Sequence, residues 1–217
     1  MTARSADGGA ARAEVLRRIR DANARAGVRE VPGVERGYRT SGEHPPGSPD
    51  ALDLFEHRLV DYRASVTRTT EGDLRDAVVA TLAGLSLDPG PVLLPPGLPA
   101  EWAPEGVRDS GDLTPADLDG MAAVVTACTV GCAETGTIVL DGSPDQGRRA
   151  ITLVPDVHVC VVRAGQVVHS VPEMLARVDG TRAVTLVSGP SATSDIELDR
   201  VEGVHGPRTL AVILVTG

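Results

Sequence analysis

The stretch Ala183-Val184-Thr185-Leu186-Val187-Ser188-Gly189-Pro190-Ser191-Ala192-Thr193-Ser194-Asp195-Ile196-Glu197 decides how the C-terminal part of the chain is expected to fold. Its first five residues are apolar or β-branched, which is typical of a short buried strand. The dipeptide Gly189-Pro190 predicts a turn. Ser194 and Glu197 have the spacing of a capping box, so a short helix is expected to start here and to end before Gly203.

This arrangement brings several hydroxyl groups to the start of a helix. Free backbone N–H groups and the positive end of the helix dipole favour an anion at that position. Ligands of open α/β sheets bind beyond the carboxyl ends of the strands, and the turn directly follows a strand. The candidate ligand-binding residues here are Ser188, Gly189, Ser191, Thr193 and Asp195. The alternative is an ordinary strand–turn–helix connection.

A histidine follows in the segment Gly203-Val204-His205-Gly206-Pro207, before a final strand expected over 209–215. The flanking glycines give the loop unusual backbone freedom, and an imidazole can act as a general base near neutral pH. His205 is therefore a candidate catalytic residue. A triad of Ser191, Asp195 and His205 is conceivable, but the sequence lacks the G-x-S-x-G motif, so a hydrolase is only weakly indicated.

Two further groups carry candidate chemistry. Glu134 is a possible general base, and its neighbours Thr135, Gly136 and Thr137 are candidate ligand-binding residues; a structural turn carboxylate is the alternative. Arg148 can pair with a carboxylate or phosphate through two parallel hydrogen bonds, together with His205. His158 lies inside an apolar run and is interpreted as structural.

The composition limits the classes of function. The chain has 217 residues, of which 41% are hydrophobic and 2% aromatic, so a sizeable core must consist mainly of aliphatic side chains. The net charge of −9 argues against nucleic acid as a partner. No apolar run reaches about 18 residues, and the N-terminus does not have the pattern of a signal peptide, so we expect a cytoplasmic protein without a membrane span.

The cysteine pattern gives no sign of a cofactor. Cys128, Cys132 and Cys160 are three in number, and their spacing fits no common zinc or iron–sulfur motif. We expect three buried, reduced thiols and no iron–sulfur cluster bound by this chain.

The periodicity of the remaining sequence predicts an α/β fold with a three-layer arrangement: an open, mostly parallel sheet with helices on both faces. Helices are expected over 11–26, 51–63, 73–83, 114–118 and 170–177, and strands over 65–69, 92–94, 138–140, 151–154, 157–162 and 167–168. Residues 1–50 form a helical arm and a Pro/Gly-rich linker, and residues 51–217 form the α/β domain. Residues 1–40 hold nine arginines and five acidic residues, so the arm is basic and the remainder is strongly acidic.

Several of these motifs, taken in order, resemble the lactate-utilization protein C (LUD-domain) family. They are Glu134-Thr135-Gly136-Thr137, Gln146-Gly147-Arg148, Leu153-Val154-Pro155-Asp156-Val157-His158, Ser188-Gly189-Pro190-Ser191 with Thr193, Asp195-Ile196-Glu197, and Gly203-Val204-His205-Gly206-Pro207. The resemblance implies a fold similar to NagB/RpiA/CoA-transferase-like domains. It also implies a role in oxidising L-lactate to pyruvate within a three-protein system, whose two other members carry the iron–sulfur clusters.

Three kinds of function follow from this resemblance and from the residues. The chain is expected to bind a small carboxylate or another anion as a subunit of the lactate-oxidising system. Alternatively, it is a non-catalytic assembly or regulatory subunit. The fold by itself also suggests an enzyme for a CoA- or phosphosugar-type ligand, although fold is a poor guide to function.

Overall fold

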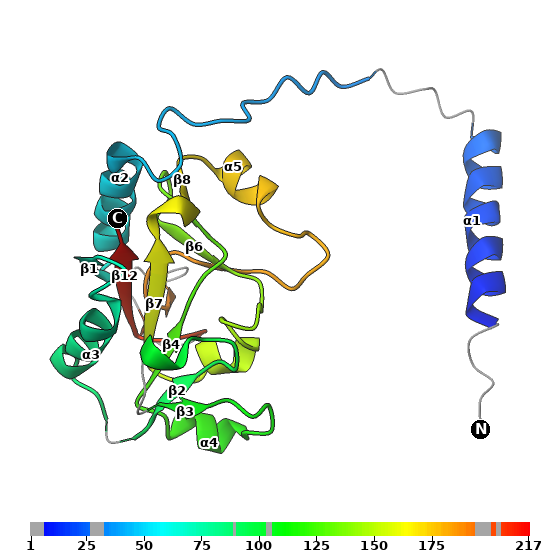
Figure 1. Ribbon diagram of the computed structural model, residues 1–217. Helices are drawn as coiled ribbons and strands as arrows, with labels where there is room; N and C mark the ends of the chain where they lie inside the picture. The colour runs from blue at the N-terminus through cyan, green and yellow to red at the C-terminus, as the bar shows by residue number, and fades with distance from the viewer. Residues whose placement is uncertain (1–6, 27–32, 89, 103–105, 194–200, 203–204) are drawn as a thin grey trace. The chain divides into compact units, whose positions relative to one another are not determined.

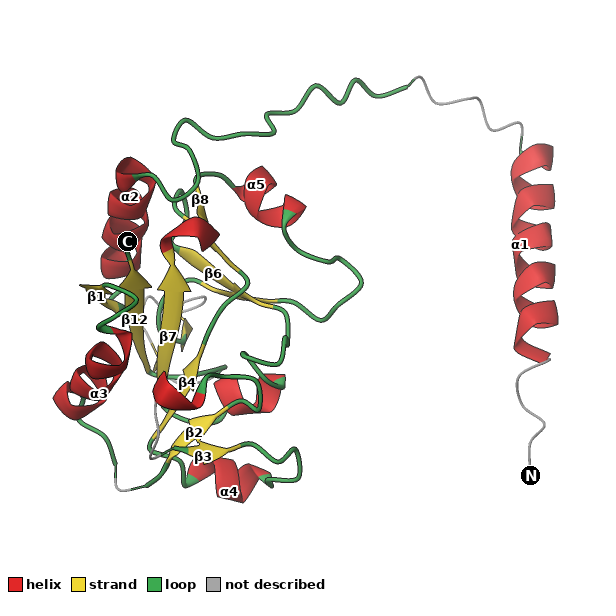
Figure 2. Ribbon diagram, viewed as in Figure 1, coloured by secondary structure: helices red, strands yellow, loops and turns green. Residues whose placement is uncertain are grey.

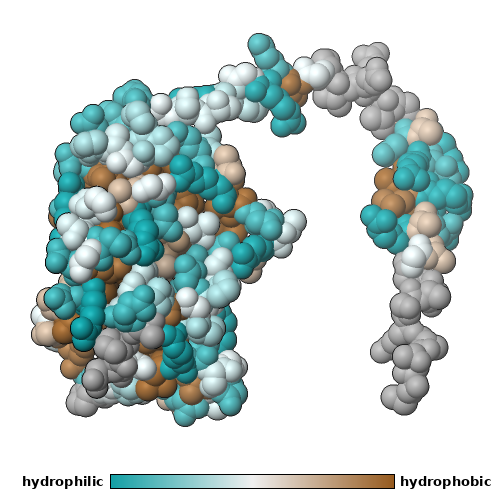
Figure 3. All heavy atoms as spheres, viewed as in Figure 1, coloured by the Kyte–Doolittle hydropathy of each residue, from teal (hydrophilic) through white to brown (hydrophobic). Residues whose placement is uncertain are grey.

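The computed structural model describes residues 7–26, 33–88, 90–102, 106–193, 201–202 and 205–217. The chain divides into two compact units, Met1–Tyr38 and Arg39–Gly217. The first unit contains the predicted N-terminal helix as α1 (Asp7–Arg25), whose surface carries ion pairs of Glu14 with Arg17 and Arg18. Val15 and Ile19 lie about half exposed on this helix. Figure 3 shows an apolar patch on its otherwise mostly hydrophilic surface.

A six-stranded parallel sheet forms the centre of the second unit. Its order is β1 (Ser65–Thr69), β12 (Thr209–Val215), β7 (Val157–Arg163), β4 (Ala123–Thr126), β2 (Val92–Leu94) and β3 (Val107–Arg108). All five pairings are parallel. Figures 1 and 2 show β12 and β7 side by side in the body. Both strands are mainly apolar and buried along most of their length, as is typical of strands whose two faces are covered.

Helices cover both faces of this sheet. Alternate residues of β7 separate into two cores: Val159 and Val161 pack with α3 (Leu74–Gly84), whereas Cys160 and Val162 pack with α2 (Pro49–Asp61). The period of two in the strand thus produces two apolar layers. The mostly parallel α/β fold predicted from the sequence is confirmed.

A smaller four-stranded sheet was not predicted. Its order is β8 (Val167–Val168), β5 (Val130–Cys132), β6 (Thr137–Leu140) and β9 (Thr185–Val187). Ile138, Leu140 and Val187 share the core of α2, so this sheet lies on the α2 side of the parallel sheet. The strand predicted at 183–187 is β9, and it belongs to the small sheet.

Short elements complete the body. They are η1 (Ala100–Trp102), α4 (Pro115–Asp119), η2 (Arg149–Thr152), η3 (Ala164–Gln166), α5 (Val171–Ala176), β10 (Ala192–Thr193) and β11 (Val201–Glu202). The capping box that predicts the start of α5 is present: Ser170 donates from its backbone N–H and its hydroxyl to the Glu173 carboxylate.

Two predicted elements are corrected. The strand expected at 151–154 is instead part of the 3-10 helix η2 and the turn after it, because a short apolar run fits either structure. The helix expected to end before Gly203 is contradicted at its C-terminal end, where Val201 and Glu202 form β11 and pair antiparallel with β10. The proposed capping residues Ser194 and Glu197 lie outside the described residues.

The segment before α2 contacts the body. Arg39 pairs with Glu134, and the backbone N–H of Gly42 donates to the Glu173 carboxylate at 3.0 Å. The Gly47 N–H donates to the Val167 carbonyl. In the part of the chain that the structure describes, no helix combines the length and the hydrophobicity that a bilayer span requires.

Candidate functional site

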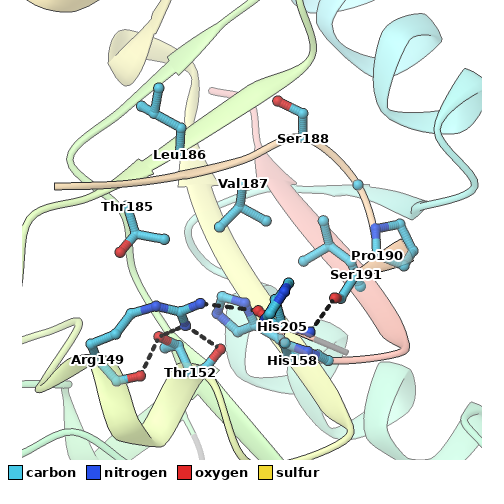
Figure 4. Close-up of a pocket in the computed structure, with 14 residues that line it drawn as sticks. Arg149, Thr152, His158, Thr185, Leu186, Val187, Ser188, Pro190, Ser191 and His205 are labelled. Atoms are coloured by element: carbon cyan, nitrogen blue, oxygen red, sulfur yellow. Dashed lines mark hydrogen bonds between the residues drawn. The ribbon is translucent and has the colours of Figure 1, made fainter. Parts of the chain in front are cut away.

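A cavity of about 250 Å³ lies between the two sheets. Its walls are β9 with the turn that follows it, η2, the loop at 205–207, and the second residue of both β7 and β12, His158 and Leu210. Figure 4 shows Thr185 and Val187 of β9 pointing toward Arg149, Thr152, His158 and His205, whereas the side chains of Leu186 and Ser188 point away from them.

The cavity lies at the amino ends of β7 and β12, and the expectation of a site at the carboxyl ends of the parallel strands is therefore corrected. The physical reason is the small sheet. The turn at Ser188 follows β9, which pairs antiparallel with β6 and is not a strand of the parallel sheet.

The turn and the His205 loop are joined directly. The backbone N–H of Ser191 donates to the Pro207 carbonyl at 2.8 Å, and the Ser191 hydroxyl accepts from the backbone N–H of His205 at 3.1 Å. Gly189 is buried at φ +88° with Tyr62 so close that a Cβ would clash. The structure thus brings Ser188, Gly189, Ser191 and His205 to one cavity.

Two other candidate residues of this stretch do not line the cavity among the described residues. Thr193 lies in β10, which pairs antiparallel with β11. Asp195 lies outside the described residues.

Arg149 is the arginine of the cavity. Its Nη2 donates to the His205 carbonyl at 3.2 Å, and its Nη1 donates to the Thr152 carbonyl at 2.8 Å. Burial lowers the pKa of Arg149 from its ordinary value, but an arginine stays protonated at neutral pH. Among the described residues it forms no ion pair with a carboxylate. Its positive charge therefore remains available to an anionic ligand.

Arg148 does not reach this cavity, which corrects its expected pairing with His205. Its Nε and Nη2 donate to the two carboxylate oxygens of Asp109 at 2.9 and 3.0 Å, and Nη2 also donates to the Leu113 carbonyl. This ion pair holds the pKa of Asp109 below its usual value. The sequence contained no signal to distinguish the two adjacent arginines, since both follow the same turn.

Glu134 lies at a separate depression of about 300 Å³, which it lines with Arg58, Asp61, Tyr62 and Thr135. Its carboxylate pairs with Arg39 at 3.0 Å. Gly136 has φ +59°, and the start of the α2 C-terminal turn at Arg58 leaves no room for a Cβ there. Thr137 is buried between Thr135 and Ser188, with its Oγ1 at 2.7 Å from each of their hydroxyl oxygens.

His158 is a further wall residue, which the sequence interpretation assigned to structure alone. It is 2% exposed, and its Nε2 lies 2.8 Å from Thr126 Oγ1. Burial, and secondarily the positive charge of Arg149, lower its pKa to about 4, so the ring is neutral at pH 7. The signal available from the sequence was its position as the second residue of the apolar run that forms β7.

The three cysteines are buried and free, as expected from their spacing. Among the described residues, no group of three histidine, cysteine or acidic side chains is arranged to hold a metal ion. The chemistry that the cavity offers is thus a cationic guanidinium, two imidazoles and the hydroxyl of Ser191, a set suited to a small carboxylate.

Comparisons with known proteins agree with this architecture. The sequence matches the model of the LUD domain over residues 99–215. It is 46% identical to lactate utilization protein C of Deinococcus radiodurans, over 79% of this chain and 82% of that protein. It is 27% identical to lactate utilization protein C of Bacillus subtilis, over 77% and 79% of the two chains.

A solved structure also resembles this one. The crystal structure of a DUF162 family protein from Deinococcus radiodurans has a TM-score of 0.64 and 39% sequence identity, and the match covers 76% of this chain and 96% of that chain. Because the family model spans more than half of the sequence and a relative shares 46% identity over most of it, this chain belongs to the LUD domain family.

Proposed function

We propose that this protein takes part in lactate utilization by binding a small 2-hydroxy or 2-oxo carboxylate in the cavity beside Arg149. The names of its relatives in Deinococcus radiodurans and Bacillus subtilis support the pathway. The observation that carries the ligand class is the guanidinium of Arg149, which lines the cavity and has no carboxylate partner among the described residues. A planar guanidinium binds a carboxylate through two parallel hydrogen bonds.

His205 supplies a second group for this ligand. Its imidazole lines the cavity, and the Arg149 guanidinium holds its backbone carbonyl in place. It is therefore the better candidate of the two proposed bases, since Glu134 lines a different depression and is paired with Arg39. In this proposal His205 contacts the carboxylate or the hydroxyl of the ligand. The variant His205→Ala, titrated with the same acids, tests this contact.

The electrons of the reaction leave through partner proteins. Oxidation of L-lactate to pyruvate releases a pair of electrons, and this proposal assigns them to two iron–sulfur proteins of the same system. The part of this chain is then to bind and orient the acid. This assignment follows what the family resemblance of the sequence motifs implies.

Calorimetric titration of the purified full chain tests the proposal. L-lactate and pyruvate are expected to bind, and lactamide, which has no carboxylate, is expected to bind far more weakly. Arg149→Gln should weaken binding of both acids by roughly tenfold or more. The matched control is Arg208→Gln, because Arg208 is an exposed arginine that lies outside the cavity.

The outcome that contradicts the proposal is equally specific. If the wild type binds neither acid, or if Arg149→Gln and Arg208→Gln bind them with the same affinity, the cavity is not the carboxylate site.

A further inference from the structure

His158 is a polar side chain buried in the wall of the cavity, and within the described part of the chain only one of its ring nitrogens has a partner. Nε2 lies 2.8 Å from Thr126 Oγ1. Nδ1 has no hydrogen-bond partner among the described residues. Among the described residues, the side-chain nitrogen that is fully enclosed and has no hydrogen-bond partner is Nδ1 of a different histidine, His169. Because His158 Nδ1 is not enclosed in this way and the ring lines the cavity, Nδ1 is the nitrogen that a ligand can reach.

A chain of hydrogen bonds behind the ring favours one of the two tautomers of neutral His158. The Cys160 thiol lies 3.8 Å from the Ala127 carbonyl, which can only accept, so the thiol donates to it. Cys160 Sγ in turn accepts from the Thr126 hydroxyl at 3.9 Å. A Thr126 hydroxyl that donates to the sulfur leaves its Oγ1 to accept from His158 Nε2 across the 2.8 Å contact.

This direction corresponds to the neutral ring with its proton on Nε2. In that tautomer Nδ1 is unprotonated and can accept a hydrogen bond. Burial and the nearby charge of Arg149 oppose a second proton, in agreement with a pKa of about 4 for His158. A neutral histidine with this tautomer accepts one hydrogen bond from the cavity and donates none to it.

We propose that His158 Nδ1 accepts the hydroxyl hydrogen of a 2-hydroxy carboxylate whose carboxylate binds Arg149, so that the cavity selects the 2-hydroxy acid over the 2-oxo acid. The inference rests on the proposed function for the position of the carboxylate. A hydroxyl group can donate to Nδ1. The carbonyl oxygen of a 2-oxo acid can only accept a hydrogen bond, so its lone pairs would repel the lone pair of Nδ1. His158 is thus a specificity-determining residue, and His205 is left to contact the carboxylate.

The tautomer can be measured without any ligand. In the full chain labelled with ¹⁵N, two-bond correlations between ring nitrogens and ring hydrogens distinguish the Nε2–H form from the Nδ1–H form. The signals of His158 are assigned by their loss in His158→Gln. The Nε2–H pattern is expected throughout pH 5 to 8. An Nδ1–H pattern, or a doubly protonated ring in this range, would overturn the inference.

Selectivity is measured by titrating L-lactate and pyruvate into the wild type and into Thr126→Val. The wild type is expected to bind L-lactate about tenfold more tightly than pyruvate. Thr126→Val removes the acceptor for Nε2–H and should bring the ratio close to one while the protein stays folded. Cys160→Ala, which releases the Thr126 hydroxyl, should lower the ratio in part. The control is Cys132→Ala, whose buried thiol donates to the His169 carbonyl outside this chain of bonds.

The two proposals fail in different ways. Equal affinity of the wild type for L-lactate and pyruvate, with both acids sensitive to Arg149→Gln, would overturn the role of His158 and leave the carboxylate site intact. Absence of binding by both acids would overturn the proposed function, and the ligand of His158 with it.

Discussion

Thr137 Oγ1 lies 2.7 Å from Ser188 Oγ, and this contact joins the loop that carries Glu134 to the turn that lines the cavity. Thr137 also contacts the Thr135 hydroxyl at the same distance. The three hydroxyls therefore form a short row across the small sheet, between β6 and the end of β9. Thr137 is buried, so its hydroxyl depends on these partners.

Removing this hydroxyl should loosen the turn. We predict that Thr137→Val lowers the free energy of unfolding by about 1–2 kcal/mol, since a buried hydrogen-bond partner is lost. It should also weaken L-lactate binding, because Ser188 is no longer held. Chemical denaturation and calorimetry measure the two effects. Thr135→Val is the matched control and should alter stability without altering affinity; equal effects of both variants on affinity would contradict the prediction.

The turn also depends on Gly189. Its φ of +88° is unfavourable for other residues, and a Cβ would lie 2.6 Å from Tyr62 Cβ and 2.8 Å from the Tyr62 carbonyl oxygen. We predict that Gly189→Ala costs about 2 kcal/mol or more in the free energy of unfolding, measured by urea denaturation. Gly180→Ala is the control, because nothing lies within 4 Å of its added Cβ. A Gly189→Ala protein as stable as Gly180→Ala would show that the turn relaxes without strain.

The ion pair of Arg148 with Asp109 should be structural. The Asp109 side chain is 4% exposed and that of Arg148 is 36% exposed. Arg148→Gln leaves a buried carboxylate without its cation, whereas Asp109→Asn leaves an arginine that water can reach. We predict a loss of roughly 2–3 kcal/mol for Arg148→Gln and a smaller loss for Asp109→Asn, after allowing for the exposure of Arg148. Binding of L-lactate should stay unchanged in both; a tenfold weaker affinity in Arg148→Gln would return this residue to the ligand site.

Stability should fall in acid because of His158. Its pKa is about 4 in the folded protein and 6.5 when unperturbed, so between these values the unfolded chain binds more protons than the folded one. The free energy of unfolding is therefore predicted to fall as the pH drops from 6.5 to about 4, by about 3 kcal/mol from this group, and to level off below. The measurement compares urea denaturation of the wild type and of His158→Gln over this range. Parallel pH curves for the two proteins would contradict the assignment.

The sequence predicted the aliphatic strands of the parallel sheet and the helices with capping boxes because these depend on local signals. The run 157–162 became β7, and Ser170 with Glu173 started α5. The small sheet escaped prediction because Val130–Cys132 is too short to show a period and pairs with segments far away in the chain. A short apolar run at 151–154 was assigned to the wrong element for a similar reason.

The candidate site was predicted in part. Ser188, Gly189, Ser191 and His205 line one cavity, as their shared loops suggested. The choice between Arg148 and Arg149 depends on which one Asp109 binds, and Asp109 is 39 positions away in the sequence. The polar role proposed for His158 depends on Thr126 of the neighbouring strand, which only the register of β4 against β7 brings within reach.

The last prediction concerns the N-terminal unit, Met1–Tyr38. Residues 1–40 carry nine arginines and five acidic residues, while the whole chain has a net charge of −9. Val15 and Ile19 of α1 are about half exposed, so this helix presents apolar and basic groups together. Such a surface is suited to docking on an acidic protein. We propose that the unit docks on an acidic partner protein, for which the iron–sulfur proteins proposed above are the candidates.

Deletion of residues 1–38 tests this role and keeps the ion pair of Arg39 with Glu134 in the body. The truncated protein is expected to retain its melting temperature within a few degrees and its affinity for L-lactate, because the cavity lies wholly within Arg39–Gly217. Its co-purification with the partner proteins should fall, and Arg17→Glu with Arg18→Glu in the full chain should reproduce that loss. Partner binding that is unchanged by the deletion would move the contact to the acidic body.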